Sequence, residues 1–562
     1  MSKNFNRFVL YNNEDEFEYV KKKTDVNIKF NRVAFIFFVF FIISIIFSIH
    51  LIHLGSRKSN TIKNDQPKII NKLHREDIVD RNGNFLAKTV SSIDIGINPV
   101  EIIDQKKLLL NLGYIFPDKD YKIIKKKLKR NKFFWFEKKI SDKNYEKIMM
   151  LGDKSIKAEE KLSRVYPQKN LFSHIIGQID DDNMGISGLE KSLDEELKNN
   201  KYSTQLTVDK DIQFLIREEL LKYNRVFKAK GSAAILMDVN NGEIISLISL
   251  PDFNPNERIN IIDTNYINRA TKGVYELGSV FKTFTLAAGI HEGVIEPETE
   301  FKNLKKSILC GKNTINEYDK KIPSSLTAEQ ILIRSGNIGS VRIGQAVGLD
   351  KFKKFMNELS LINSIKFDIE EVGIPVSFKW GKCKLATASY GHGITTTILQ
   401  LANAYSIITN GGYKISPTLI KKDIVLKKRK KILKNDVSNK INPILRKIVT
   451  SEEGTASLAN INGYEVGGKT GTAQKSNVGG YSKNKINTFA SIFPTSNPKF
   501  VLVVMLDEPK TNSEYIYNYR DGSGIKYKGT PYNTAGWTTV EIVGQIIEKI
   551  GPILATKYNE VY

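Results

Sequence analysis

"YELGSVFKTFTLAAGI" (residues 275–290) places a serine, Ser279, directly after a glycine, and a lysine, Lys282, three positions further on. Apolar residues recur at helical spacing after the serine, which predicts a helix that begins at Ser279 and ends near Gly293. Residues three apart on a helix share a face, so the lysine can reach the hydroxyl. A serine is a weak nucleophile until a base removes its proton, and a lysine can be that base only while it is neutral.

A serine and a lysine three apart recur by chance in a lysine-rich chain, so further elements are needed. The stretch "LTAEQILIRSGNIGSVRIG" (326–344) is the second. Thr327 and Gln330 predict a capping box for a short helix, which should break at "SGN" before another helical segment. Ser335 and Asn337 then lie on a helix-to-helix connection, where they can project into a cleft. The alternative for "SGN" alone is a solvated turn.

A third element, "GYEVGGKTGTAQK" (463–475), predicts a strand entered through a pair of glycines. Gly471 leaves space for another backbone to lie close alongside. Strand alternation puts Thr470 and Thr472 on one face, where two hydroxyls can hold a carboxylate. The same alternation turns Lys469 the opposite way, so the pleat does not show that it reaches the serine.

The length of 562 residues indicates more than one domain, and 41% hydrophobic residues fit a folded protein. A formal net charge of +24 would suit nucleic acid or an anionic membrane as partner. The excess is scattered in lysine runs such as 122–132 and 427–431, and no nucleic-acid-binding motif accompanies it. A solvated lysine-rich surface is therefore favoured over a nucleic-acid partner.

The two cysteines, Cys310 and Cys383, are too few for a disulfide framework and show no metal-binding spacing. They either pair with each other or serve as small core residues. The second interpretation is favoured.

One stretch near the start, residues 33–54, is long and apolar enough to cross a membrane as a helix. It exceeds the apolar region of a cleavable signal peptide, and no small-residue cleavage site follows, so we expect a retained anchor. The stretch contains no Lys, Arg, Asp or Glu, which argues against a buried helix of a soluble protein. Basic residues are nearly balanced on its two sides, so the charge rule does not decide the orientation.

The three elements occur together, and in this order, in penicillin-binding proteins and class A β-lactamases, with "SGN" here in place of "SDN". The chain resembles a class B high-molecular-weight penicillin-binding protein over nearly its full length. Its upstream stretches "REDIVDRNGNFLA" (75–87), "RVYPQKNLFSHIIGQ" (164–178) and "GISGLEKSLDEEL" (185–197) resemble the motifs of the non-catalytic pedestal domain of that class. Residues 231–256 resemble the opening of the transpeptidase domain, and their alternation around "GEIISLIS" independently predicts strands.

The resemblance implies an α+β fold in four parts. They are a cytoplasmic tail (1–32), a single transmembrane helix (33–54), an elongated pedestal (55–230), and a transpeptidase domain (231–562) whose antiparallel sheet is sandwiched by helices. Stem peptides lie outside the cytoplasmic membrane, so the resemblance also places the residues beyond the helix in the periplasm of a single-pass inner-membrane protein.

The implied activity is D,D-transpeptidation of peptidoglycan stem peptides through a serine acyl-enzyme, without metal or cofactor. Ser279 is the implied nucleophile and Lys282 its base, while Ser335 relays a proton and Asn337 holds Lys282 and the substrate amide. Lys469 is expected to keep Lys282 neutral by like-charge repulsion. The implied substrate-binding residues are Thr470, Gly471 and Thr472 of the third element, and the implied oxyanion donors are the backbone N–H groups of Ser279 and Thr472.

By the same resemblance, β-lactam antibiotics would acylate Ser279. Segments 389–412, 489–509 and 534–554 are similar to the division-specific branch of the class, which predicts action at the septum with divisome proteins and a SEDS-family lipid-II polymerase such as FtsW. The elongation-specific branch is the alternative.

Three other classes fit less well. A secreted serine β-lactamase would lack the membrane span and pedestal motifs. A membrane β-lactam sensor usually carries several crossings and a protease module. A catalytically dead scaffold would not need the intact set of motif residues.

Overall fold

The structure is a computed structural model with two units, residues 1–72 and 73–562, which are described separately. It describes residues 32–56, 74–199, 202–257, 264–311, 313–422, 429–477 and 480–558. Of the expected cytoplasmic tail, the structure describes only Arg32. The other basic residues that flank the apolar stretch also lie outside the described residues.

Helix α2 (Arg32–Ser56) contains the expected membrane-spanning stretch. It is 25 residues long, which corresponds to about 37 Å at 1.5 Å per residue, more than the roughly 30 Å of a hydrocarbon core. Its window Phe35–Ile52 is long and apolar enough to cross a membrane, and none of that window is buried against protein. The length and composition of the helix fit a membrane anchor.

The pedestal is built on a long strand, β2 (Phe85–Ile97), which pairs antiparallel with β3 (Phe134–Ile140) and β4 (Ile156–Val165). Helices α4 (Gln105–Ile115), α5 (Tyr121–Leu128) and α6 (Asp142–Met149) bury apolar residues in a small separate core beside these strands. The short remaining elements are β1 (Ile78–Val79), β5 (Thr204–Gln205), α7 (Ser173–Ile176), α8 (Gly188–Ser192) and α9 (Asp194–Asn199).

The lysine run 122–132 forms most of α5 and the turn that follows it. Only the apolar Ile124 and Leu128 of this helix are buried, whereas the lysines of the run are exposed. These lysines therefore lie on the protein surface, as a solvated lysine-rich face requires.

A buried ionic network joins the three pedestal motifs. Arg75 comes from the first motif, Arg164 from the second and Glu190 from the third, and all three side chains are almost completely buried. Arg75 Nε donates to Glu190 Oε2 at 2.9 Å, and Arg164 Nε donates to Glu190 Oε1 at 2.7 Å. Asp194 Oδ1 accepts from Arg75 Nη1 at 2.6 Å. Segments more than a hundred residues apart are thus held by one carboxylate.

The second domain is organised around a five-stranded antiparallel sheet of order β12-β13-β14-β6-β7. The strands are β6 (Gly231–Asp238), β7 (Ile244–Leu250), β12 (Gly467–Asn477), β13 (Gly480–Phe493) and β14 (Phe500–Asp507). Strands β6 and β7 are present as predicted, but all their residues are buried, so the alternation does not separate core from solvent. Both faces of these strands are covered by protein.

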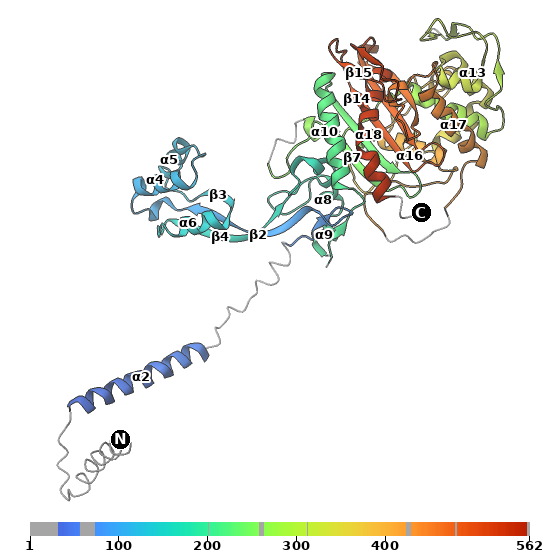
Figure 1. Cartoon of the computed structure of the whole chain (residues 1–562). Coiled ribbons are helices and arrows are strands. Elements are labelled where there is room, and N and C mark those ends of the chain that lie inside the picture. Colours follow the sequence, from blue (N-terminus) through green and yellow to red (C-terminus); the bar gives the residue numbers. More distant parts are fainter. Residues whose placement is uncertain are drawn as a thin grey trace, which may run out of the picture. The chain divides into compact units, whose positions relative to one another are not determined.

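Helices cover the two faces of this sheet. Helices α10 (Lys210–Val226) and α18 (Thr539–Lys557) pack together against one face, as Figure 1 shows for the green and red helices. Helices α16 (Ile398–Thr409) and α17 (Asn435–Thr450) pack against the sheet through β14, β6 and β12. The predicted α+β architecture of an antiparallel sheet between helices is confirmed.

A helical subdomain and short hairpins complete the domain. The helices are α11 (Phe281–His291), α12 (Ala328–Ile333), α13 (Asn337–Val347), α14 (Leu349–Glu358) and α15 (Lys382–Ala388). The short strands form three pairs: β8 (Glu300–Phe301) with β11 (Leu326–Thr327), β9 (Ser307–Cys310) with β10 (Asn313–Asn316), and β15 (Ile516–Asn518) with β16 (Lys526–Lys528).

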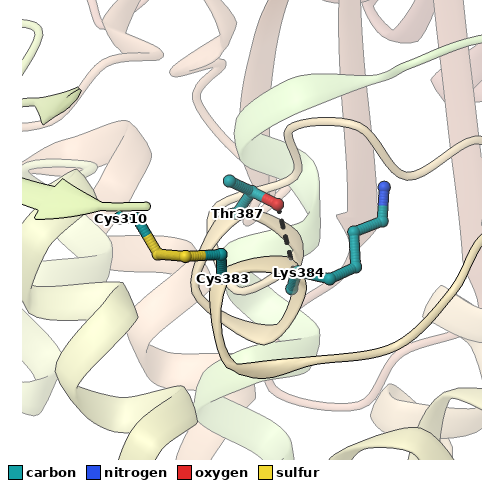
Figure 2. Close-up of a disulfide and its surroundings, with 4 residues drawn as sticks. All are labelled: Cys310, Cys383, Lys384 and Thr387. Atoms are coloured by element: carbon teal, nitrogen blue, oxygen red, sulfur yellow. Dashed lines mark hydrogen bonds between the residues drawn. A yellow bond between two sulfur atoms is a disulfide. The ribbon is translucent and has the colours of Figure 1, made fainter. Parts of the chain in front are cut away.

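The favoured interpretation of the cysteines is wrong. Cys310 ends β9 and Cys383 lies in the first turn of α15, and the two form a disulfide with a Cα–Cα distance of 5.4 Å (Figure 2). Cys383 is exposed and Cys310 only half-buried, so neither is a core residue. Packing brings together two surface elements separated by 73 residues in sequence.

Candidate active site

Ser279 lies in a 3-10 turn, η4 (Gly278–Val280), and α11 begins only at Phe281. The prediction that the α-helix begins at Ser279 is therefore wrong by one tight turn. Gly278 has a φ of +64°, and a Cβ there would lie 2.9 Å from the carbonyl oxygen of Thr472. Only glycine allows the chain to turn this close to β12. The serine is half-buried and lines a cleft of about 610 Å³.

Lys282 lies in the first turn of α11, and only 1% of the residue is exposed. Its Nζ donates to Asn337 Oδ1 at 2.7 Å, to the Ser335 carbonyl oxygen at 2.5 Å, and reaches Ser335 Oγ at 3.2 Å. Burial lowers the pKa of Lys282 to about 7, although the nearby Glu317 carboxylate acts in the opposite direction. A substantial fraction of this amine is therefore neutral near pH 7, as a general base requires.

The connection between α12 and α13 brings Ser335 and Asn337 to this amine. The predicted capping box is present, because the Thr327 hydroxyl accepts from the Gln330 amide and the Gln330 side chain accepts from the Thr327 amide. The helix then breaks at "SGN" as expected, and Ser335 adopts a left-handed φ of +59°. Such strain in a residue other than glycine concentrates at functional sites.

Lys469 lies on β12 and is completely buried. Its Nζ donates to Ser335 Oγ at 2.9 Å and to the Thr470 carbonyl oxygen at 3.3 Å. The pleat alone did not show this contact. The two lysine amines therefore converge on one serine hydroxyl, that of Ser335.

The main cause of the lowered pKa of Lys282 differs from the expected one. Burial is the leading cause of the lowered pKa of Lys282, rather than repulsion by Lys469. The pKa of Lys469 is lowered well below its ordinary value, first by burial and then by the charge of Lys282. The two sites interact, so a proton on one disfavours a proton on the other.

Thr470 and Thr472, which stand on either side of Gly471 in β12, line the cleft. Thr470 Oγ1 lies 2.7 Å from Thr455 Oγ1, and Thr472 Oγ1 accepts from the Ala535 amide at 3.0 Å. The predicted close approach at Gly471 is confirmed, because a Cβ there would lie 2.1 Å from the Leu277 carbonyl oxygen.

Further polar residues of the cleft were not identified from the sequence. Glu276 accepts hydrogen bonds from the Gly393 amide at 2.9 Å and from the Tyr481 hydroxyl at 2.9 Å. His392 Nδ1 lies 3.8 Å from the same carboxylate. Glu276 stands three positions before Ser279 in the opening stretch, but its partners come from distant segments, so no local spacing indicates them.

Comparison with known proteins identifies two domain families. Residues 232–522 match the family of the penicillin-binding protein transpeptidase domain. Residues 71–222 match the penicillin-binding protein dimerisation domain.

Similar proteins include the probable peptidoglycan D,D-transpeptidase FtsI of Caulobacter vibrioides, which is 29% identical over 86% of this chain and 82% of that protein. The probable peptidoglycan D,D-transpeptidase PenA of Neisseria meningitidis is 28% identical over 78% of this chain and 81% of that protein. The crystal structure of penicillin-binding protein 3 from Mycobacterium tuberculosis, complexed with aztreonam, has a TM-score of 0.65 at 22% identity. It covers 85% of this chain and 96% of that one. At that identity the likeness concerns the fold. The transpeptidase family match extends over more than half of the chain, and the chain belongs to the class B penicillin-binding proteins.

Proposed function

We propose that this protein is a peptidoglycan D,D-transpeptidase that cross-links stem peptides through an acyl-enzyme on Ser279. The observation that carries the proposal is the convergence of two buried amines on the Ser335 hydroxyl, at 3.2 Å for Lys282 and 2.9 Å for Lys469, next to a cleft that Ser279 lines. Relatives named as D,D-transpeptidases support the substrate class. In this proposal, residues 55–230 form the pedestal and residues 231–562 the transpeptidase domain, and α10, at the end of the first range, packs against the transpeptidase sheet.

The contacts of the two amines with Ser335 support the relay step of the proposed chemistry, and the step between Lys282 and Ser279 is assigned from the family resemblance and their spacing in sequence. Neutral Lys282 takes the proton of Ser279 as Oγ attacks the carbonyl between two terminal D-alanines. The proton passes through Ser335 to the leaving amine, and free D-alanine departs. An amine from a neighbouring stem peptide then attacks the ester carbonyl and forms the new amide of the cross-link, while the C–O bond to Ser279 breaks and the proton lost by the amine returns to Ser279 Oγ through Lys282. Lys469 holds the Ser335 hydroxyl and Asn337 holds Lys282 during these transfers.

The third element supplies binding groups. The hydroxyls of Thr470 and Thr472, which line the cleft, would hold the terminal carboxylate of the stem peptide. The backbone N–H groups of Ser279 and Thr472 would stabilise the oxyanion, a kind of contact whose loss typically costs about 10²- to 10³-fold in rate. The close approach of Gly278 to the backbone of Thr472 supports this pairing.

Labelling of the full chain with fluorescent penicillin tests the reaction. Wild type should be labelled covalently, and Ser279→Ala should not. Ser496→Ala is a matched control, because Ser496 is exposed and does not line the cleft, and it should label like wild type. Failure of wild type to label after long incubation would refute the enzyme assignment.

We further propose that α2 anchors the protein in the cytoplasmic membrane with the pedestal and transpeptidase domain in the periplasm. There it would act at the septum beside a SEDS-family polymerase such as FtsW and other divisome proteins. The FtsI names of relatives in Caulobacter and Buchnera support a role in division. Depletion followed by microscopy tests this role, because filaments are expected and rounded cells would indicate the elongation branch instead.

A further inference from the structure

The strand pair β9–β10 ends beside the active-site connection. Glu317, the residue after β10, accepts hydrogen bonds from the backbone of α13: Oε2 from the Asn337 amide and Oε1 from the Ile338 amide, both at 2.8 Å. Asn316 accepts from Asn337 Nδ2 through its carbonyl oxygen, also at 2.8 Å. Two consecutive residues therefore hold both the backbone and the side chain of Asn337.

These contacts replace a local cap. The first N–H groups of a helix have no partner within the helix, and the N-cap residue of α13 is Gly336, whose lack of a side chain leaves them unsatisfied locally. The Glu317 carboxylate, which follows β10, accepts from these N–H groups and so caps α13. The helix dipole also favours a negative charge at this end of the helix. With Nδ2 of Asn337 bound to Asn316, its Oδ1 is left to accept from Lys282 Nζ at 2.7 Å.

Glu317 also faces the lysine electrostatically. The described groups around Lys282 are the buried Lys469, the ring of Tyr318 with its centroid 6.0 Å from Nζ, and Glu317. Burial lowers the pKa of Lys282, and the charge of Glu317 raises it. Removal of that charge should therefore leave Lys282 neutral at a lower pH.

The strand pair that carries Glu317 is anchored at both ends. The Glu317 amide donates to the Lys306 carbonyl oxygen at 2.9 Å. At the far end of β9, the disulfide from Cys310 to Cys383 ties the pair to α15 (Figure 2). Glu317 thus follows a strand pair that is held at both ends, by a backbone hydrogen bond and by a disulfide.

We propose that Glu317 is a positioning residue for acylation, which acts through Asn337 and through its charge on Lys282; this inference rests on the proposed function. The carboxylate sets where α13 begins and so where the Asn337 side chain meets the base. It does not itself touch the reacting atoms.

The test measures the rate of acylation of the full chain in detergent by fluorescent penicillin over about pH 5.5 to about 9. The variants are Glu317→Ala, Glu317→Gln and Glu317→Asp. Asp319→Asn is the matched control, because this carboxylate, two positions further on, accepts from the Lys321 amide instead of from α13. Circular dichroism of each variant reports whether it is folded.

We expect Glu317→Ala to lower the plateau rate by about tenfold or more, because two N–H groups lose a charged acceptor. Glu317→Gln should lower the plateau less and move the rising limb of the pH profile to lower pH, which a merely structural role would not do. Glu317→Asp should keep the limb near the wild-type pH, and Asp319→Asn should stay within about twofold of wild type.

The proposal is overturned if Glu317→Gln keeps both the wild-type plateau and the wild-type limb. If Glu317→Ala does not fold, Glu317→Gln decides alone, since it conserves the volume of the side chain. Absence of labelling in wild type would instead refute the proposed function, and this inference with it, before any Glu317 variant is compared.

Discussion

Glu190→Gln tests whether one buried carboxylate holds the three pedestal motifs together. Glu190 is fully buried and accepts from two guanidinium groups, those of Arg75 and Arg164. Glutamine is uncharged, and one of its two polar atoms is an NH2 donor instead of an acceptor, so the guanidinium that faces this atom loses its hydrogen-bond acceptor. After the change, Arg75 keeps Asp194 at 2.6 Å, whereas Arg164 loses its carboxylate partner.

The magnitude follows from that uncompensated cation. Removal of one partner from a buried ion pair typically lowers the free energy of unfolding by about 3–5 kcal/mol. For a cooperative unit of roughly 150–250 residues, this corresponds to a thermal midpoint lower by about 6–20 °C. The large effect is expected because the side chain of Arg164 is only 1% exposed and water cannot replace the lost partner.

Thermal unfolding of the full chain in detergent, followed by circular dichroism, measures the effect. Glu218→Gln is the matched control, because Glu218 is 48% exposed and pairs with Arg217 at the surface, where ion pairs contribute little. Its midpoint should equal that of wild type. A Glu190→Gln midpoint within about 2 °C of wild type would refute the reasoning from buried charge.

Three further predictions concern the second domain. Burial lowers the pKa of Lys282 to about 7, and the neutral amine is the proposed base, so the rate of acylation by fluorescent penicillin should rise about tenfold from pH 6 to pH 8; a flat profile would contradict this role. Cys383→Ser should lower the free energy of unfolding by about 2–4 kcal/mol, because it opens the cross-link to Cys310, and reduction with dithiothreitol should destabilise wild type but not the variant. Gly471→Ala should slow labelling by more than about tenfold, since the new methyl would meet the Leu277 carbonyl oxygen at 2.1 Å; wild-type labelling would show that the two backbones can separate freely.

Much of the local structure could be predicted from the sequence. The apolar run of α2, the capping box at Thr327 and Gln330, the break at "SGN" and the strand around Gly471 all follow from neighbours within one turn or one strand. The order of the three sequence elements also predicts the family. The predicted start of the helix differs from the observed one, because the sequence pattern does not distinguish a 3-10 turn from the first turn of an α-helix.

Contacts between distant segments could not be predicted in this way. The spacing of Cys310 and Cys383 in the sequence does not indicate that they form a disulfide. Strand alternation predicts that Lys469 faces away from Thr470 and Thr472, yet its long side chain reaches Ser335. Glu317 belongs to no motif, yet it caps the helix that presents Asn337.

The sequence by itself thus predicted which residues would carry the proposed chemistry, because their types and order are linear properties of the chain. Tertiary structure decided their protonation and their mutual placement. Burial in a packed core lowers the pKa values of Lys282 and Lys469, and only the folding of α11, the α12–α13 connection and β12 against one another brings both amines to the hydroxyl of Ser335.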